Sequence, residues 1–462
     1  MMSEVALPQE GRYWPQLAAL SLAMVLPSLG TSIANVALPN LATSFGAPMA
    51  DVQWVVISYL LSVTCFIIPA GRLGDMIGRS RLLLVGMTLF AAASAASAIA
   101  PSLWFLIGAR AVQGVGAAAM MALTVAMVGD LMPKGRIGSA MGLLGTVSAV
   151  GTALGPTLGG ALIAAFGWPA VFAVLGVLSG LSLVISRSLF PTDPPVSHQT
   201  IGYDGTGTAL LALALLALSS ALTLGARLPS LAGVALVALS ALSIVAFVLH
   251  EARTPSPLVR MELLRERTLG MGLLSMALVS AIVMTTLVVG PFYLSEALSL
   301  EPIQIGFVMS VGPAVAALTG APAGRLVDSL GAFRVMVAGL LAVAAGSIFL
   351  AFLPGWFGVS GYVVSLTVIT FGYALFQAAN TTAVMQSVTS DTRGVTSAML
   401  GLSRNLGLIS GASAMGAIYA MGPRIAEALG LVAGDEAGLR ITFIVAAGLA
   451  ALALCANFRG RG

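Results

Sequence analysis

The chain is poor in charged residues. Asp, Glu, Lys and Arg make up 8% of its 462 residues, whereas soluble domains carry about 25%. Hydrophobic residues make up 58%, and the mean hydropathy is +1.02. This composition excludes a soluble protein. The apolar sequence is long enough for about a dozen or more membrane spans of roughly 20 residues each.

The sequence has only two cysteines and no recognisable cluster of catalytic residues. Cys65 and Cys455 both fall in apolar runs, so we expect buried free thiols and no disulfide framework. The chain has no phosphate-binding Gly-x-x-x-x-Gly-Lys-Ser/Thr loop, so we expect no ATPase domain. It has no paired acids and no His-x-x-x-His spacing at membrane depth. We therefore expect no enzyme activity, no metal and no cofactor.

Apolar segments of spanning length recur along the whole chain. In lipid they must be helical, because each unsatisfied backbone group there costs several kcal/mol. Their bounds are 14–39, 52–70, 81–99, 102–127, 138–163, 169–190, 205–225, 230–250, 269–295, 304–321, 334–353, 358–386, 396–420 and 439–457. We expect an all-α polytopic membrane protein with fourteen transmembrane helices.

Basic residues gather on one side of these segments. With both termini cytoplasmic, the inside loops and tails carry sixteen basic residues and the outside loops carry three, while Arg110 and Arg404 lie within helices. The positive-inside rule then places both termini in the cytoplasm. The net charge of +4 thus indicates membrane orientation and no nucleic-acid partner. A single lysine among 21 basic residues favours a bacterial cytoplasmic (inner) membrane.

A charged hairpin occurs twice. Residues 71–82 read GRLGDMIGRSRL, and a degraded copy at 324–334 reads GRLVDSLGAFR. Matching hairpins in two halves indicate an internally duplicated transporter. Eight segments separate the copies where a six-plus-six duplication needs six, so we place an extra pair at 205–250, facing lipid and carrying no chemistry. The predicted domains are a six-helix bundle at 1–190, a linker and two-helix insertion at 191–268, and a second six-helix bundle at 269–462.

Four more stretches occur in a fixed order. They are Thr31–Pro39 (TSIANVALP), Gln53-Trp54, Arg110–Gly116 (RAVQGVG) and Gly151–Gly160 (GTALGPTLGG). With the hairpins, they resemble the fourteen-helix drug:proton antiporter family of the major facilitator superfamily, over essentially the whole chain. The resemblance implies two six-helix bundles that alternate access to a central cavity.

The hairpins are candidates for a cytoplasmic latch. An aspartate at a helix end can accept hydrogen bonds from a helix N-terminus across the interface, and the arginines can pair with acids of a neighbouring helix. The latch residues are Gly71, Asp75, Gly78, Arg79, Arg81 and Asp130, with Gly324, Asp328 and Arg334 in the second copy. We expect Gly71 and Gly78 to allow close approach and turning. The alternative is that these charges only fix the topology.

The fifth segment carries a glycine stripe with one proline. Its residues are Gly151, Gly155, Pro156, Gly159 and Gly160. Small residues let two helices approach closely, and the proline bends the segment. In the family the motif is associated with antiport, and plain helix packing is the alternative.

Two arginines lie deep within predicted helices. Arg110 is roughly 13 Å from the outer surface at about 1.5 Å per residue. A charge at that depth costs at least about 2.5 kcal/mol, so it needs a wet cavity or hydrogen-bond acceptors. The family resemblance implies a role for Arg110 in proton coupling, and the alternative is a structural arginine bonded to carbonyls of helix one. The same reasoning applies to Arg404.

Polar and aromatic residues of both halves are candidates for a substrate cavity. Amides in membrane helices can instead be interhelical contacts, and aromatic residues can simply be core. The cavity candidates are Thr31, Asn35, Arg110, Gln113, Tyr293, Phe376, Gln377, Asn380 and Arg404.

Acids at membrane depth are missing. Many relatives carry an aspartate in helix one where this chain has Gly30. A proton-coupled carrier needs a titratable group, and Glu296 is the remaining candidate beside Arg110, unless it is a solvated acid at a loop end. Both histidines, His198 and His250, are expected in loops. Without such a carboxylate, we expect neutral or anionic amphipathic substrates to be preferred over quaternary-ammonium dyes.

These observations predict a secondary active efflux transporter for small amphipathic organic compounds, driven by the proton gradient. The alternative is a carrier for one defined organic anion, as exporter, symporter or facilitator. We expect a monomer whose partners are the small-molecule substrate and the lipid bilayer.

Overall fold

The computed structural model describes residues 13–132, 137–190, 204–224, 230–254, 266–387, 393–428 and 436–459. In these ranges every regular element is helical. Long runs of apolar residues with few charged interruptions explain this, because only helices satisfy their own backbone groups in lipid.

The N-terminal half contains seven helices. They are α1 (Tyr13–Phe45), the short α2 (Met49–Val52), α3 (Trp54–Ile77), α4 (Arg79–Ala98), α5 (Leu103–Leu131), α6 (Ile137–Phe166) and α7 (Pro169–Leu189). The insertion contains α8 (Gly205–Leu224) and α9 (Ser230–Glu251).

The C-terminal half follows with a similar set. It contains α11 (Arg267–Glu296), α12 (Pro302–Leu330), α13 (Ala332–Ser387), α14 (Arg393–Ser410), the π-helical turn η2 (Gly411–Met415), α15 (Gly416–Ala428) and α16 (Ala437–Arg459). Gly358 has φ 54° and ψ −131°, so it breaks α13 into two helices. In contrast, α14, η2 and α15 follow one another without a gap.

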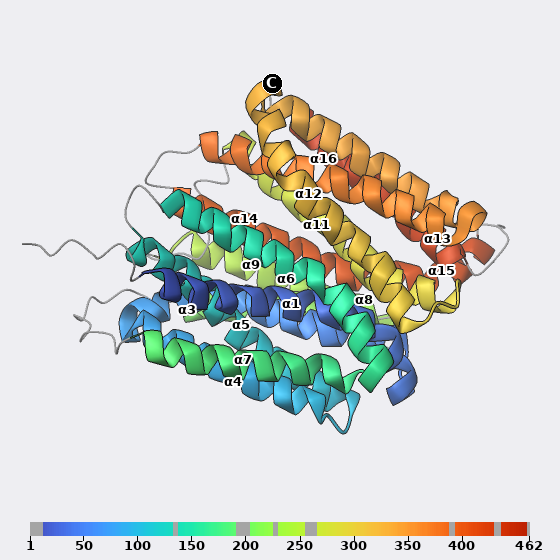
Figure 1. Cartoon of the computed structure of the whole chain (residues 1–462). Coiled ribbons are helices and arrows are strands. Elements are labelled where there is room, and N and C mark those ends of the chain that lie inside the picture. The colour runs from blue at the N-terminus through green and yellow to red at the C-terminus, as the bar shows by residue number, and fades with distance from the viewer. Residues whose placement is uncertain are drawn as a thin grey trace, which may run out of the picture.

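Eleven helices of the described residues are long and apolar enough to cross a membrane. Figure 1 shows the helices side by side along one axis, with α1, α3, α4, α5 and α7 on one side and α12, α13 and α16 on the other. This arrangement confirms an all-helical polytopic fold.

The same backbone turn joins two helices in each half. Gly78, with φ 104°, separates α3 from α4, and Gly331, with φ 83°, separates α12 from α13. Glycine is favoured at such angles because a Cβ would clash with the backbone. Gly160, near the C-terminus of α6, lies against Gly306, near the N-terminus of α12. Because successive spanning helices run in opposite directions, the turns at Gly78 and Gly331 both lie at the other end of the bundle. We call it the hairpin end.

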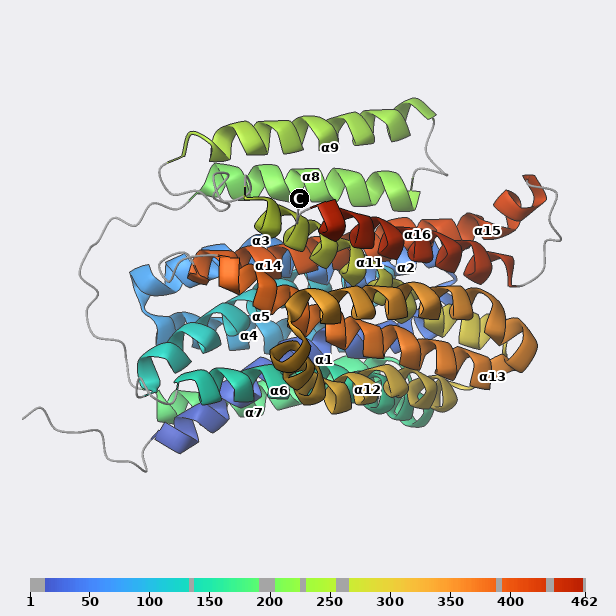
Figure 2. The ribbon, with the colours of Figure 1, turned by 90° about the horizontal axis from the view of Figure 1, so that it is seen from above.

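The insertion does not only face lipid. Figure 2 shows α8 and α9 as a pair along one flank, with α9 outermost and largely exposed. However, α8 packs against α3, and Trp54 Nε1 donates to Thr223 Oγ1 at 3.0 Å. Ser413 Oγ of η2 also donates to Ser219 Oγ at 3.2 Å. The expectation that both helices of the pair face lipid was therefore wrong for α8, because α8 carries small hydroxyl residues that bond to both halves.

The two cysteines differ in their surroundings. Both are free thiols, Cys65 buried and Cys455 exposed. The prediction that both are buried was wrong for Cys455, because it lies on the outer face of the last helix, α16.

Candidate functional site

Helix α6 packs its glycine stripe against α1. Cβ atoms built on Gly151, Gly155 and Gly159 would lie 2.8 Å from Val25 O, 2.8 Å from Ile33 N and 3.1 Å from Ile33 Cγ1. Real Cβ atoms essentially never approach within 3.0 Å of such atoms. Only glycine permits this helix spacing at the first two positions.

The stripe also contacts the other half of the molecule. A Cβ on Gly160 would lie 2.7 Å from Pro302 O, and a Cβ on Gly306 would lie 2.6 Å from Pro156 O. Beside this backbone contact, the hydroxyls of Thr157 and Ser310 are hydrogen-bonded. The motif therefore joins α6 to α12 as well as to α1. Sequence reasoning missed Gly306, which lies outside the repeated hairpins.

A second contact between the halves involves Gln53. Its side chain is 1% exposed and lies directly against Gly416 of α15. Neither amide atom of Gln53 has a hydrogen-bond partner among the described residues. Like Gly160 and Gly306, this contact lies at the end of the bundle opposite the hairpin end, since it involves the N-terminal end of α3.

The glycines of the two hairpins differ in how closely they are packed. A Cβ on Gly71 or Gly324 would meet no atom within 4 Å, so the expected close approach at Gly71 was wrong. Gly74 instead packs directly against Leu123 of α5. Arg79 Nη1 donates to Ala126 O at 3.4 Å.

The charges of the proposed latch are only partly described. Arg81, Asp328 and Arg334 are exposed. The side chains of Asp75 and Asp130 lie outside the described residues. The latch therefore stays a prediction.

Arg110, with 0% exposure, is the largest fully buried side chain among the residues that the structure describes. Its Nε donates to Val55 O of α3 at 3.0 Å, and Nη2 donates to Gly30 O of α1 at 3.1 Å. Its Nη1 donates to Gln113 Oε1. Three acceptors on three helices thus meet one guanidinium, which satisfies donors that would be costly to bury alone.

Aromatic rings complete the surroundings of Arg110. Its guanidinium carbon lies 4.1 Å from the ring centroid of Tyr59 and 5.8 Å from that of Phe172, which are cation–π distances. Tyr59 is held in place by a hydrogen bond from its hydroxyl to Pro27 O at 2.8 Å. Within the described part of the chain, no carboxylate pairs with Arg110. Carbonyls, one amide and two rings stabilise its charge instead.

Gly30 occupies the helix-one position where many relatives carry an aspartate, and its surroundings show where that side chain would lie. A Cβ there would lie 3.2 Å from Phe90 Cζ and 3.5 Å from the Tyr59 hydroxyl. An aspartate would therefore project into the surroundings of Arg110, with a tight contact to Phe90. The glycine leaves a backbone carbonyl as the acceptor at this position.

The amides of the candidate cavity behave differently from one another. Gln113 Nε2 donates to Ser94 Oγ of α4 at 2.6 Å, and Asn380 Nδ2 donates to Gly272 O of α11 at 3.1 Å, so both connect helices. In contrast, Thr31 and Asn35 bond within α1, to Pro27 O at 3.0 Å and Thr31 O at 3.1 Å. Asn35 Oδ1 is buried without a hydrogen-bond partner among the described residues.

The candidates of the C-terminal half lie on α11, α13 and α14. Tyr293 stacks on Tyr362 with ring centroids 6.2 Å apart. Phe376 is fully buried, and Gln377 is half-buried. Arg404 is exposed, unlike the enclosed Arg110. The structure therefore gathers Arg110, Gln113 and Gly30 into one buried cluster but does not place all nine predicted cavity residues together.

The ionisable residues near helix ends differ in exposure. Glu296 ends α11 and is exposed. His250 lies in the last turn of α9 and not in a loop, so that expectation was wrong. His198 lies outside the described residues. Sequence reasoning also missed Asp204 and Glu251, which are buried beside His250.

Duplicated bundles of apolar helices, joined by close glycine contacts and enclosing a buried arginine, define a membrane transporter. The chain belongs to the Major Facilitator Superfamily, because the model of that family matches residues 20–412. This is a family of transporters and not of enzymes.

Similar sequences are transporters too. The riboflavin transporter RibZ of Clostridioides difficile is 27% identical over 410 residues, covering 88% of each chain. The multidrug resistance protein Stp of Mycobacterium tuberculosis is 29% identical over 407 residues, covering 87% of this chain and 75% of Stp. The multidrug efflux pump LfrA of Mycolicibacterium smegmatis is 29% identical over 412 residues, covering 88% of this chain and 81% of LfrA.

Solved structures share the fold. A bacterial homolog of the human lysosomal transporter Spinster, in an inward-facing conformation, superposes with a TM-score of 0.72 at 16% identity, over 98% of this chain and 97% of that one. The transporter PepTSo gives a TM-score of 0.72 at 18% identity, over 97% and 98%.

Proposed function

We propose that this chain is a secondary active efflux transporter for small amphipathic organic compounds, working by proton-coupled alternating access. Relatives named as multidrug resistance and efflux proteins support this function. The break of α13 at Gly358 and the continuous run of α14, η2 and α15 favour the fourteen-helix subfamily. The energy source is the proton gradient.

The contact between Gly160 and Gly306 carries the proposal. It joins the two halves through backbone atoms at the end opposite the hairpin end. A contact made by backbone atoms and one hydroxyl pair has few interlocking groups to break, so two rigid bundles can rock about it. Opening then occurs at one end at a time, with the hairpins acting as a latch at theirs.

The substrate preference follows from charge. Arg110 has no carboxylate partner among the described residues, and Arg404 is exposed. A carrier that lacks a membrane-depth acid and presents the exposed Arg404 favours neutral or anionic amphiphiles over lipophilic cations. Higher affinity for ethidium than for anionic compounds would contradict this preference.

The second candidate function is transport of one defined organic anion. The relative named as a riboflavin transporter supports a single-compound role. A carrier of this kind would show saturable transport that only one class of compounds inhibits, whereas an efflux pump would accept several classes.

We further propose that the protein is a monomer in the bacterial cytoplasmic membrane, with both termini and the hairpin end in the cytoplasm. The excess of basic residues in the loops on that side supports this orientation.

The experiment is transport in proteoliposomes under an imposed pH gradient of either sign. The panel contains cationic, neutral and anionic amphiphiles. Proton-coupled antiport predicts uptake that follows the gradient and reverses with its sign. Equilibration at the same rate without a gradient would identify a facilitator.

A further inference from the structure

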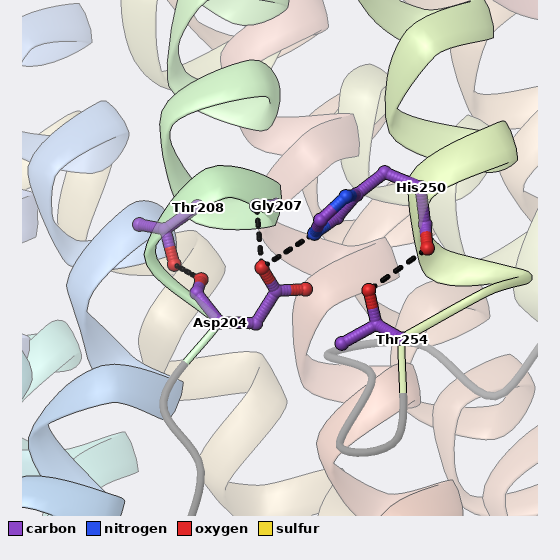
Figure 3. Close-up of polar contacts among 5 residues, drawn as sticks. All are labelled: Asp204, Gly207, Thr208, His250 and Thr254. Atoms are coloured by element: carbon purple, nitrogen blue, oxygen red, sulfur yellow. Dashed lines mark hydrogen bonds and ion pairs between the residues drawn. The ribbon is translucent and has the colours of Figure 1, made fainter.

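Three ionisable residues meet where the two helices of the insertion come together. Asp204 directly precedes α8, and His250 lies beside it in the last turn of α9 (Figure 3). Glu251 is the last residue of α9. Asp204 is 5% exposed and Glu251 is 3% exposed. Fully buried acidic side chains are rare and are almost always paired, so two buried carboxyl groups in one place point to an interaction between them.

One oxygen of Asp204 is fully engaged. Oδ1 accepts the Gly207 backbone N–H at 2.7 Å and lies 2.8 Å from His250 Nε2. Thr208 Oγ1 also donates to the backbone carbonyl of Asp204 at 2.8 Å. These contacts make Asp204 the N-cap of α8, where the positive end of the helix dipole favours a negative charge.

The other oxygen of Asp204 faces Glu251. Oδ2 is buried and accepts no hydrogen bond from an N–H or hydroxyl group of the described residues. A Cβ on Gly207 would lie 2.5 Å from this Oδ2 and 2.5 Å from Glu251 Oε1, so the two carboxyl groups flank one methyl-sized space. Two ionised carboxylates at such a separation repel strongly, and one of the pair keeps a proton.

The helix ends decide which carboxyl group keeps it. Glu251 is the last residue of α9, where the negative end of the dipole disfavours a second negative charge. For Asp204, burial opposes ionisation, but hydrogen bonds from Gly207, His250 and Glu251 outweigh it and lower its pKa. The charge therefore stays on Asp204, and Glu251 can donate its proton to Oδ2.

We propose that Asp204 and Glu251 form a proton-binding site between α8 and α9, with the proton carried by Glu251. His250 holds the charged partner in place. Loss of the proton leaves two adjacent negative charges and favours separation of the two helices at this end. Because α8 bonds to Trp54 of one half and to Ser413 of the other, this change reaches both bundles.

The surrounding charges are few among the described residues. From α8 and its cap comes Asp204, and from α9 and the turn after it come His250, Glu251 and the exposed Arg253. Arg72 is on α3, which packs along α8. The charged residues of α2 and α15 are Asp51, Arg424 and Glu427. They lie toward the other end of α8, where Thr223 contacts Trp54. Apart from Glu251, none of these described residues brings another carboxyl group to the Asp204 end.

Infrared spectroscopy of the full chain in lipid vesicles tests the site without any transport assay. At neutral pH, the difference spectrum of wild type minus Glu251→Gln should contain the C=O band of a protonated carboxyl group. This band should shift in D₂O. Glu296→Gln, which removes an exposed acid, is the matched control. The difference spectrum of wild type minus this variant should contain only the bands of an ionised carboxylate. A carboxylate band for Glu251 would overturn the proposal.

Two further readouts keep the test decisive. Glu251→Gln should leave the thermal midpoint near that of wild type, because an amide resembles a protonated carboxyl group, while Asp204→Asn should lower it. A Glu251→Gln chain that fails to fold would contradict a neutral Glu251. Carboxylate bands that respond to Na⁺ or Mg²⁺ at constant pH would assign the site to a metal cation and overturn proton binding.

Discussion

Arg110 shows how a charge can be kept inside an apolar bundle. The guanidinium combines backbone carbonyls of α1 and α3 with Gln113 and the Tyr59 ring. Removing the side chain leaves these acceptors buried without donors, and an unsatisfied buried group costs about 1–3 kcal/mol. The stability of the N-terminal half therefore depends on this residue, whatever it contributes to transport.

Replacing Arg110 with Met should lower the free energy of unfolding by about 2 kcal/mol or more, as well as reduce transport. Thermal unfolding in detergent checks the first effect. Arg404→Met is the matched control, because Arg404 is exposed, and should change stability much less. Equal midpoints for wild type and Arg110→Met would mean that Arg110 serves coupling only.

A Gly30→Asp substitution should restore an acid beside Arg110 and make transport depend more steeply on the pH gradient. The new side chain approaches Phe90, so the variant is best made with Phe90→Leu. Gly30→Asn in the same background has nearly the same size and no charge, and it should leave the pH dependence unchanged. Identical pH profiles for the Asp and Asn variants would exclude this position as a proton site.

The lowered pKa of Asp204 gives a sign to the acid dependence of stability. Its contribution is complete above the unfolded value of about 3.9 and is lost as the pH falls through the lower folded value. Asp204→Asn should cost about 1 kcal/mol at neutral pH through the weaker cap. Its unfolding midpoint should also fall less on acidification than that of wild type. Parallel acid profiles would contradict the assignment.

At the scale of elements, α6 and α12 approach through Gly160 and Gly306, and volume added there has nowhere to go. Gly160→Val should hinder this contact and reduce the transport rate at least tenfold, a change of about 1.4 kcal/mol in barrier height. Gly180→Val in α7 is the matched control, since a Cβ there meets no atom within 4 Å. Full activity of Gly160→Val would remove the contact from the mechanism.

Helices and their order could be predicted from the sequence, because continuous apolar runs permit only helices in lipid. The break at Gly358 was implied by the gap between segments 334–353 and 358–386. The glycine stripe was visible as a motif, but its second contact was not, since Gly306 has no recognisable pattern around it. The cluster of Asp204 and Glu251 was missed because its members come from the two ends of a helix pair, and only the folded pair brings them together.

At the scale of the whole molecule, α8 connects the two halves through hydroxyl groups. Cysteines at positions 219 and 413, in a chain lacking Cys65 and Cys455, should form a disulfide on oxidation, because the hydroxyl oxygens there are 3.2 Å apart. If the halves move relative to α8, cross-linked protein transports more slowly and reduction restores the rate. The single-cysteine variants are the controls. Unchanged transport after complete cross-linking would show that α8 moves with the C-terminal half.

Gln53 has a consequence for the populations of the two access states. Its amide is buried against Gly416 with neither end bonded to the described residues, and such a group costs about 1–3 kcal/mol. When the halves separate at that end, water can bond to the amide and the cost disappears. The conformation closed at this end is thus disfavoured by roughly tenfold for each 1.4 kcal/mol. The buried Gln53 amide therefore shifts the equilibrium of the carrier toward the conformation that is open at this end.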